Sequence, residues 1–279
     1  MEEKLAVSFS RKDESLPEEL SGEYDLTAFI GEHSFIYCLR DREKDRFVAA
    51  EVLKEPLERV LQAYPWLGQP FRSVHLVIEN NKSTLVPEML YEDSDRENLL
   101  DFTVDRGIRE QILADHLQHP QVYNLFAVPE DLLNRVKAAF PTGKICHVTS
   151  TLIETLWINF KNRLSARKLF VHLRDGSFDL VVYDGAQLYY ANSFSFLVPE
   201  DVAYYVIFVM EQLGLNPEET GAVLLGQIDR KSPVFELLFR YIRNLEFASR
   251  GESVRVSPAF HDVPEHFLYL LLNPVLCGS

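Results

Sequence analysis

The sequence predicts an α/β fold in two lobes, each built on a three-stranded meander that leads into a helix. The clearest signal is residues 168–228, where three short runs rich in aromatic and β-branched residues precede a helical pattern and one more apolar run. Two Asp-Gly pairs, Asp175-Gly176 and Asp184-Gly185, separate the three runs, and this pair is typical of tight hairpin turns. A weaker copy of the same order occupies residues 24–64. One supersecondary plan is therefore predicted to occur twice.

In the first half, apolar runs predict strands at residues 5–9, 24–30, 34–39 and 47–53. Pro56 suits the first position of a helix over residues 55–64, which Pro65 and Gly68 end. Residues 74–78 and 84–86 flank Asn80-Asn81 and are expected to form a hairpin. The remaining elements expected here are a short acidic helix at 94–101, strands at 112–117 and 122–128, a helix at 130–140, a buried strand at 144–147 and a long helix at 149–162.

In the second half, strands are expected at residues 169–173, 178–183 and 187–196. Gly214 suits the C-terminal end of the helix that follows Pro199, because glycine readily adopts the left-handed conformation found there. A buried strand at 222–225 precedes a second helix, which starts at Ser232-Pro233 and is expected to reach Leu245. Residues 250–253 are expected to form a linker, 254–256 an edge strand and 264–272 a C-terminal helix. The apolar stripe of the first helix consists of Val202, Tyr205, Val206, Val209, Met210 and Leu213.

The two halves also align with each other at a constant offset. Leu26 falls on Leu169, Ser34-Phe35 on Ser177-Phe178, and Asp41 on Asp184. When two residues are deleted at the second turn, residues 47–50 fall on 188–191. Chance similarity of two meanders is the alternative explanation. The shared order of strands, turns and helix favours a duplication.

Composition excludes several classes of protein. The 279 residues include 47% hydrophobic residues, enough for a packed core, and carry a net charge of −14. Because nucleic-acid binding normally needs a basic surface, this acidic chain is not expected to bind nucleic acid. The cysteines Cys38, Cys146 and Cys277 are too far apart for a metal or redox motif, and the first two are expected to be buried. With no signal peptide and no apolar run long enough to span a membrane, the expected location is the cytoplasm.

Two meander-plus-helix halves joined by a helix resemble the actin-like ATPase fold, a duplicated ribonuclease H-like fold with two lobes and a central cleft. The chain is distantly similar to the branch that contains the type IV pilus inner-membrane actin-like protein. More closely, the stretches DVAYYVIFVMEQLGL, VYNLFAVP and LYLLLNPVLCGS resemble an uncharacterised bacterial family with this fold and no assigned function. The resemblance implies a first lobe at residues 1–147, with 262–279 packing back on it, and a second lobe at 148–261.

In actin-like ATPases, each hairpin turn carries an Asp-x-Gly loop whose N–H groups hold phosphates and whose carboxylates position Mg²⁺. The resemblance places Phe29 and His172 at the two carboxylate positions. Arg174 stands where the second turn should have glycine, and the adenosine-contacting loop is reduced to Gly226-Gln227-Ile228. The residues of this degenerate cleft, which are the nucleotide-binding positions if there are any, are Phe29, Gly31, Glu32, His172, Arg174, Asp175, Gly226 and Gln227.

Phosphoryl transfer depends on positioning and charge stabilisation, so the loss of both metal-facing carboxylates should remove most catalysis. The sequence therefore predicts a non-catalytic pseudo-ATPase that serves as an interaction or scaffold module, with an unidentified protein partner and no cofactor. Two alternatives stay open. In one, the chain is a divergent ATPase that uses Mg²⁺ and relocated carboxylates such as Glu32, Asp175 and Asp179. In the other, the cleft keeps affinity for ATP without turnover.

Other candidate chemistry has simpler explanations. Asp115, His116 and His119 suggest a metal site, but the sequence offers no third rigid ligand, so surface histidines are favoured. Cys146 and His147 are adjacent in a predicted strand and so face opposite ways, which favours a buried thiol and a hydrogen-bonded histidine over a nucleophile and its base. Core packing is favoured over a binding surface for a group of aromatic residues: Phe194, Phe196, Tyr204, Tyr205 and Phe208.

Overall fold

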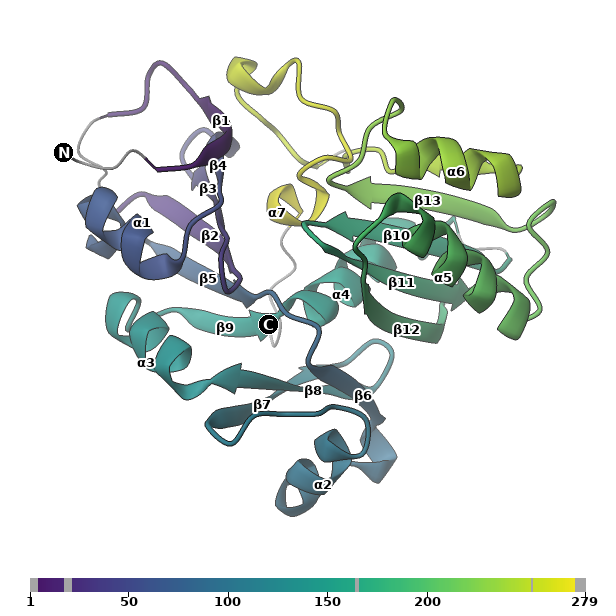
Figure 1. The fold of residues 1–279 in the computed structure, drawn as a ribbon. Helices are drawn as coiled ribbons and strands as arrows, with labels where there is room; N and C mark the ends of the chain where they lie inside the picture. Colours follow the sequence, from purple (N-terminus) through teal and green to yellow (C-terminus); the bar gives the residue numbers. More distant parts are fainter. Residues whose placement is uncertain (1–4, 18–21, 164–165, 252, 274–279) are drawn as a thin grey trace.

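The computed structural model describes residues 5–17, 22–163, 166–251 and 253–273, and these form three sheets with helices around them (Figure 1). The first sheet has six strands in the order β1-β4-β3-β2-β5-β9. Its strands are β1 (Val7–Lys12), β2 (Tyr24–Ile30), β3 (Phe35–Asp41), β4 (Arg46–Leu53), β5 (Ser73–Ile78) and β9 (Lys144–His147). The helices of this region are α1 (Leu57–Ala63), the 3₁₀ turn Pro65–Gly68 and α3 (Glu130–Ala139).

The second sheet has five strands in the order β12-β11-β10-β13-β14. Its strands are β10 (Lys168–Arg174), β11 (Ser177–Asp184), β12 (Gln187–Ser195), β13 (Gly221–Gly226) and β14 (Leu245–Phe247). Helices α5 (Pro199–Gln212) and α6 (Pro233–Tyr241) cover its outer face. The chain ends with the 3₁₀ turn Pro258–Phe260 and the short helix α7 (Tyr269–Leu272).

A small unit is inserted between β5 and α3 and lies at the bottom of Figure 1. Its three-stranded sheet has the order β6-β8-β7. The strands are β6 (Ser83–Pro87), β7 (Glu110–Leu117) and β8 (Val122–Pro129), with α2 (Arg96–Asp101) and the 3₁₀ turns Glu88–Leu90 and Asp93–Asp95 beside them. The insertion begins with the loop that directly follows β5, and it ends where β8 leads without a loop into α3.

The strand registers confirm the internal repeat that the sequence predicts. In β2 and β3, Leu26 pairs with Leu39, and in β10 and β11 the aligned residues Leu169 and Val182 pair in the same way. After Leu39 of β3 the register shifts by an extra residue in β4, and after the aligned Val182 of β11 it shifts by an extra residue in β12, so both pairs carry a β-bulge at the same place. Strand β5 follows the first meander and pairs in parallel with β2. In the same way, β13 follows the second meander and pairs in parallel with β10. The two halves therefore share their register as well as their order of elements.

The core has three large parts. One lies between the two big sheets around the buried helix α4 (Val148–Phe160) and includes α7. The other two cover the outer faces of the sheets, under α1 and α3 on one side and under α5 and α6 on the other. Cys38 and Cys146 are buried, as the sequence predicts, whereas Cys277 lies outside the described residues. None of the helices in the described part has the length and apolar character that crossing a membrane requires.

Four expectations about secondary structure are wrong. Strands β5 and β6 do not form a hairpin, because β5 pairs in parallel with β2 and β9 whereas β6 pairs with β8 in the inserted sheet. The expected edge strand at 254–256 is only an isolated bridge between Phe47 and Val256. Helix α6 ends at Tyr241, and residues 245–247 form β14 instead of its last turn. Within residues 264–272, only Tyr269–Leu272 is α-helical. The lobe boundary at residue 147 stays a prediction, although β9 ends there.

Candidate functional site

The two hairpin turns of the meanders face each other across the middle of the molecule, and equivalent positions in them have diverged. Phe29 is 4% exposed and lies in the core between the sheets, where it pairs in register with Ile36. The aligned pair in the second half is His172 with Asp179. An apolar cross-strand pair in one half therefore corresponds to a polar pair in the other.

Asp179 is the centre of a buried polar network. It is 1% exposed, and its Oδ2 lies 2.8 Å from His172 Nδ1 and accepts a hydrogen bond from Arg174 Nε at 3.0 Å. Its Oδ1 accepts from Arg174 Nη2 at 2.8 Å and from Ser193 Oγ at 2.6 Å. Burial alone would raise the pKa of this carboxyl, but the charge of Arg174 and the hydrogen bond from His172 lower the pKa well below its usual value. Asp179 is thus an ionised carboxylate with both oxygens already occupied.

The network continues from the second sheet to the loop after β5 in the first. Arg174 Nη2 donates to Asn81 Oδ1 at 2.7 Å, and Asn81 Nδ2 donates to Ser195 Oγ in β12 at 3.0 Å. Closer to solvent, Lys54 Nζ at the end of β4 lies 3.0 Å from Asp175 Oδ2 in the second turn. These contacts join the two halves to each other.

Glu79 contributes a second carboxyl to this centre. It directly follows β5, its backbone N–H donates to Ile30 O at 2.9 Å, and Ser34 hydrogen-bonds its side chain. Burial raises the pKa of Glu79, and the positive charge of Arg174 opposes that rise only in part. Glu79 corresponds by position to Gln227 after β13, whose N–H donates to Leu173 O at 2.8 Å. The same backbone contact thus occurs in both halves, but only the first half carries a carboxyl there.

Gly226 is buried, and the backbone N–H groups of Gly226 and Gln227 are both hydrogen-bonded within the chain. Gly226 has φ of +92°, and an added Cβ would lie 3.0 Å from His172 Cδ2 and clash with Leu173 O. Its backbone N–H donates to His266 O at 2.8 Å, and His266 Nε2 lies 2.7 Å from Ile228 O. The backbone donors that could face a nucleotide in this loop are therefore already used by β10 and by the C-terminal segment.

These residues do not fit Mg²⁺ and ATP. Of the carboxylates considered from the sequence, the Glu32 side chain is 89% exposed, that of Asp175 is 60% exposed and paired with Lys54, and Asp179 is saturated by its donors. The first turn closes on itself through the hydrogen bond from Gly31 N to Ser34 O at 2.9 Å. Among the described residues, no group of three or more His, Cys, Asp or Glu side chains is placed to hold a metal ion.

A second polar cluster connects the inserted unit to the start of α4. His147 caps this helix by accepting from Thr149 N at 3.2 Å, and its ring also lies 3.2 Å from Asn80 Oδ1 and 3.3 Å from Asn124 Nδ2. Burial lowers the pKa of His147 to about 3, so the ring is neutral. Asp115 accepts from His147 N at 2.8 Å. The expected buried thiol of Cys146 and hydrogen-bonded His147 are confirmed.

The carboxyl of Asp115 provides a prediction for pH dependence. Burial raises its pKa to about 6, above an unfolded value of about 3.9. Because the native state then binds this proton more tightly, the contribution of Asp115 to stability is complete below about pH 4 and is lost as pH rises through about 6. The free energy of unfolding of Asp115→Asn, measured relative to that of wild type, should therefore rise by up to about 3 kcal/mol between about pH 4 and pH 8. Urea unfolding at both pH values checks this. The exposed Asp131→Asn is the control, and equal changes in both variants would contradict the prediction.

The remaining candidates from the sequence are not brought into this centre. His116 stacks on Tyr123 and His119 stacks on Trp157, so they form no common metal site. Tyr205, Phe194 and Phe196 pack on the core of the second half, as expected, but Tyr204 and Phe208 are 63% and 45% exposed. The expectation of core packing is therefore wrong for the last two.

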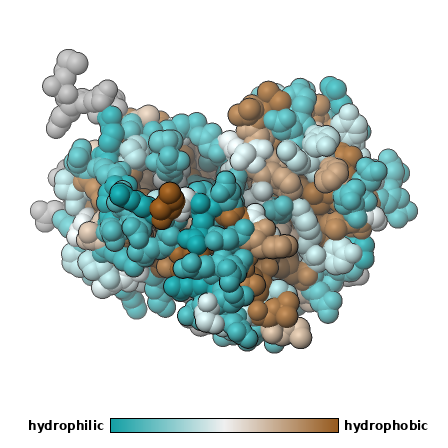
Figure 2. Space-filling view, turned by 60° about the horizontal axis from the view of Figure 1, so that its bottom comes forward, coloured by the Kyte–Doolittle hydropathy of each residue, from teal (hydrophilic) through white to brown (hydrophobic). Residues whose placement is uncertain are grey.

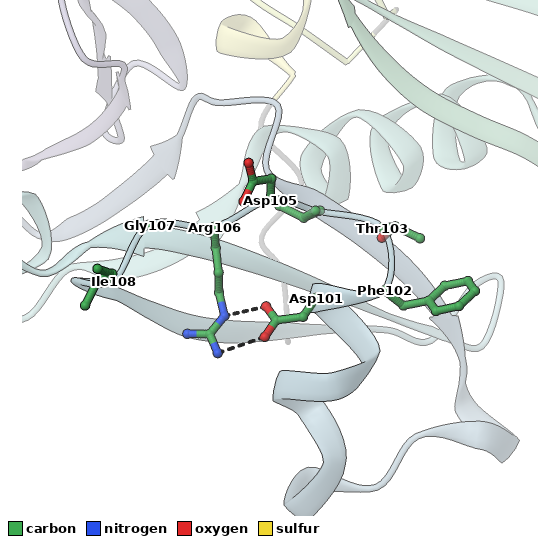
Figure 3. A pocket seen from close by; sticks show the side chains of 8 residues that line it. Asp101, Phe102, Thr103, Asp105, Arg106, Gly107 and Ile108 are labelled. Atoms are coloured by element: carbon green, nitrogen blue, oxygen red, sulfur yellow. Dashed lines mark hydrogen bonds and ion pairs between the residues drawn. The ribbon is translucent and has the colours of Figure 1, made fainter.

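A surface hollow lies away from the network, in the inserted unit. Residues 101–108 line it, and Figure 3 shows Arg106 directed toward Asp101, with Nη2 3.0 Å from Oδ2. The wall comes from a single exposed segment. Figure 2, which brings the lower side of the molecule forward, shows a mostly hydrophilic face with hydrophobic residues in separate patches. The hollow is thus a feature of one loop and gathers no chemistry from elsewhere in the fold.

Sequence reasoning missed the first-half side of the network, namely Glu79, Asn80 and Asn81. Their position just after a buried run was the available signal, because polar residues at the carboxyl end of a parallel strand gather at the site edge of a sheet. The interpretation of Asn80-Asn81 as a hairpin turn hid that signal. His266 was also missed, since it comes from a segment expected to be helical.

The duplicated meanders, the two sheets on either side of α4 and the facing hairpin turns define an actin-like ATPase fold. A Bacteroides thetaiotaomicron protein with this fold and unknown function has a TM-score of 0.76 to this chain at 20% identity, covering 84% of this chain and 94% of the other. The structure of a PilM–PilN type IV pilus biogenesis complex gives a TM-score of 0.58 at 13% identity, with 90% and 97% covered.

At the level of sequence, residues 13–245 match the family model named protein of unknown function DUF3822. Because the match covers most of the chain, the protein belongs to this family. No curated protein gives a significant match. The family and the fold predicted from the sequence are confirmed, and neither assigns an activity.

Proposed function

We propose that this protein is a non-catalytic member of the actin-like ATPase fold that works as an interaction or scaffold module. The observation that carries the proposal is the saturated carboxylate of Asp179, held by Arg174, His172 and Ser193 where a nucleotide site would need free ligands. Phosphoryl transfer by this fold requires carboxylates that face Mg²⁺ and N–H groups that face phosphates. Both kinds of group are engaged within the chain.

The network also supports a scaffold role over a hinged one. Arg174, Asn81 and Ser195 join the two halves by hydrogen bonds at 2.7 and 3.0 Å, beneath the exposed ion pair of Lys54 with Asp175. Opening the cleft would leave the buried Arg174 without part of its hydrogen bonding, which is costly in a low-dielectric interior. We therefore infer one preferred arrangement of the two halves, suited to presenting a fixed surface to a protein partner. A PilM–PilN complex shows that a chain of this fold occurs in a protein complex.

Phosphate release and a thermal shift assay with ATP, with and without Mg²⁺, test the proposal. We expect no release above the protein-free rate and no change in melting temperature at millimolar ATP. The variants Glu32→Ala and Asp175→Ala provide the comparison, because these exposed carboxylates are the relocated ligands that the alternative requires. Saturable stabilisation with hydrolysis that either variant abolishes would establish a divergent ATPase. Stabilisation without hydrolysis would establish a nucleotide-binding cleft and would equally overturn the proposal.

A further inference from the structure

The sheet edges of this protein are protected in different ways. Among the strands that the structure describes, β1 and β9 are the edges of the first sheet, β6 and β7 those of the inserted sheet, and β12 and β14 those of the second sheet. Natural edge strands avoid pairing with other chains by being short or by carrying charges or proline. Five of these six edges show such protection: Arg11 and Lys12 in β1, Lys144 in the short β9, Pro87 in β6, Glu110 and Asp115 in β7, and Glu246 in the three-residue β14.

Strand β12 is the exception, because its bulge at Tyr189 lies near the start of the strand and Tyr190–Ser195 pair regularly with β11. Its nine residues, Gln187–Ser195, include no charge and no proline, and the uncharged stretch extends from Gly185 to Pro199. A quarter of the whole chain is Asp, Glu, Lys or Arg, so this is a marked local gap in charge. A long, uncharged edge strand is a ready template for pairing with another strand.

The backbone of β12 directs N–H groups toward its open side, where β11 does not bind them. Phe196 N donates to Gly176 O at 3.0 Å, so Phe196 and its alternate neighbours Phe194 and Asn192 direct their N–H groups toward β11. The N–H groups of Ala191 and Ser193 therefore point away from β11. Ser193 N is bound only locally, to Asn192 Oδ1 at 2.9 Å. A partner strand could take over these donors without disturbing the β11 ladder.

Aromatic side chains extend this edge over the neighbouring helix. Phe194 in β12 stacks on Tyr205 in α5, with ring centroids 4.8 Å apart, and Tyr205 packs edge-on against Tyr204 at 5.2 Å. Tyr204 in turn stacks on Phe208 at 6.1 Å, and Leu197 at the strand–helix junction is 96% exposed. The result is one continuous surface from the open edge of β12 to the exposed side of α5, suited to aromatic anchoring.

We propose that a second copy of this chain occupies this surface, with the two β12 strands antiparallel about a two-fold axis perpendicular to the sheet. Two chains of net charge −14 repel each other, so a self-contact is favoured where neither copy presents acidic charge. Residues 185–199 contain no acidic side chain, and the charged group that lies over β12 is the Arg167 guanidinium, 4.5 Å from the Tyr189 ring centroid. Such pairing is isologous, joins the five-stranded sheets into one, and places both α5 helices on the same face. The proposal does not depend on whether the cleft binds nucleotide.

Sedimentation velocity of the full chain over about 1–100 µM tests the pairing. We expect a reversible dimer. Asn192→Lys puts a like charge at the middle of both edges, and Ala191→Pro removes an outward N–H that the β11 ladder does not use. Each variant should raise the dissociation constant of the dimer at least about tenfold.

Gln69→Lys in the first half adds the same charge at an exposed position away from β12 and should leave the dimer unchanged. Circular dichroism of each variant confirms that the fold is kept. A monomer throughout the concentration range would overturn the proposal. So would a dimer that neither β12 variant weakens, because its contact would then lie elsewhere.

Discussion

Asp179→Ala is expected to lower the free energy of unfolding by about 3–5 kcal/mol. The reason is the Arg174 guanidinium, which is 5% exposed as a residue and would lose its two hydrogen bonds to the carboxylate. An unpaired buried charge costs more than the pair contributes, so removing one partner is far more harmful than replacing both. Urea unfolding of the variant at neutral pH measures the loss.

Asp175→Ala is the matched control for this prediction, because the two aspartates lie four positions apart on the same hairpin. The Asp175 side chain is 60% exposed and pairs with the equally accessible Lys54, and an exposed pair contributes no more than about 1 kcal/mol. The double variant Arg174→Met/Asp179→Leu should recover part of the stability lost in Asp179→Ala. If the two aspartate variants lose equal stability, Asp179 is not the centre of a buried network.

Gly226→Ala is the second change with a large expected effect. Its φ of +92° disfavours any residue with a side chain, and the added Cβ would overlap Leu173 O. Because β10 and the C-terminal segment hold this loop on both sides, the backbone has little room to shift. We expect a loss of more than about 4 kcal/mol or failure to fold, measured by urea unfolding or by the yield of soluble protein.

Gly176→Ala separates backbone strain from this steric clash. Gly176 also has a positive φ, +68°, but nothing lies within 4 Å of the position of its Cβ. Strain alone should cost about 1–2 kcal/mol there. If Gly226→Ala lowers the free energy of unfolding by as little as Gly176→Ala does, the loop at Gly226 can shift to make room for the added Cβ.

Local patterns were sufficient to predict the duplicated part of the fold. The alignment of Leu26 with Leu169 and of Asp41 with Asp184 follows from turn chemistry and strand periodicity, and the registers and the shared bulge agree with it. Phe29 and His172 are aligned by the same repeat, and they pair at equivalent positions with Ile36 and Asp179. A repeat in the sequence thus fixes equivalent strand positions, whereas a role of these residues in a nucleotide cleft stays a prediction.

The partners of these residues were not accessible, because they depend on long-range pairing. Asn81 resembles a turn residue locally, but it lies in the loop after β5 and accepts a hydrogen bond from Arg174, 93 positions later in the chain. Asp179 was considered only as a relocated metal ligand, because no local pattern shows that Arg174 would saturate it. Likewise, Leu245 was predicted as the end of a helix, because it continues an apolar stripe and only pairing with β13 makes it part of a strand.

We propose that side chains and backbone of this protein occupy the place where an actin-like ATPase would hold nucleotide and metal. Isothermal titration calorimetry of the full chain with ATP and Mg²⁺, at protein concentrations that detect millimolar dissociation constants, tests it most directly. We predict heats that match those of dilution into buffer, for wild type and for Glu32→Ala alike. A saturating isotherm with one ATP bound per chain would contradict the claim.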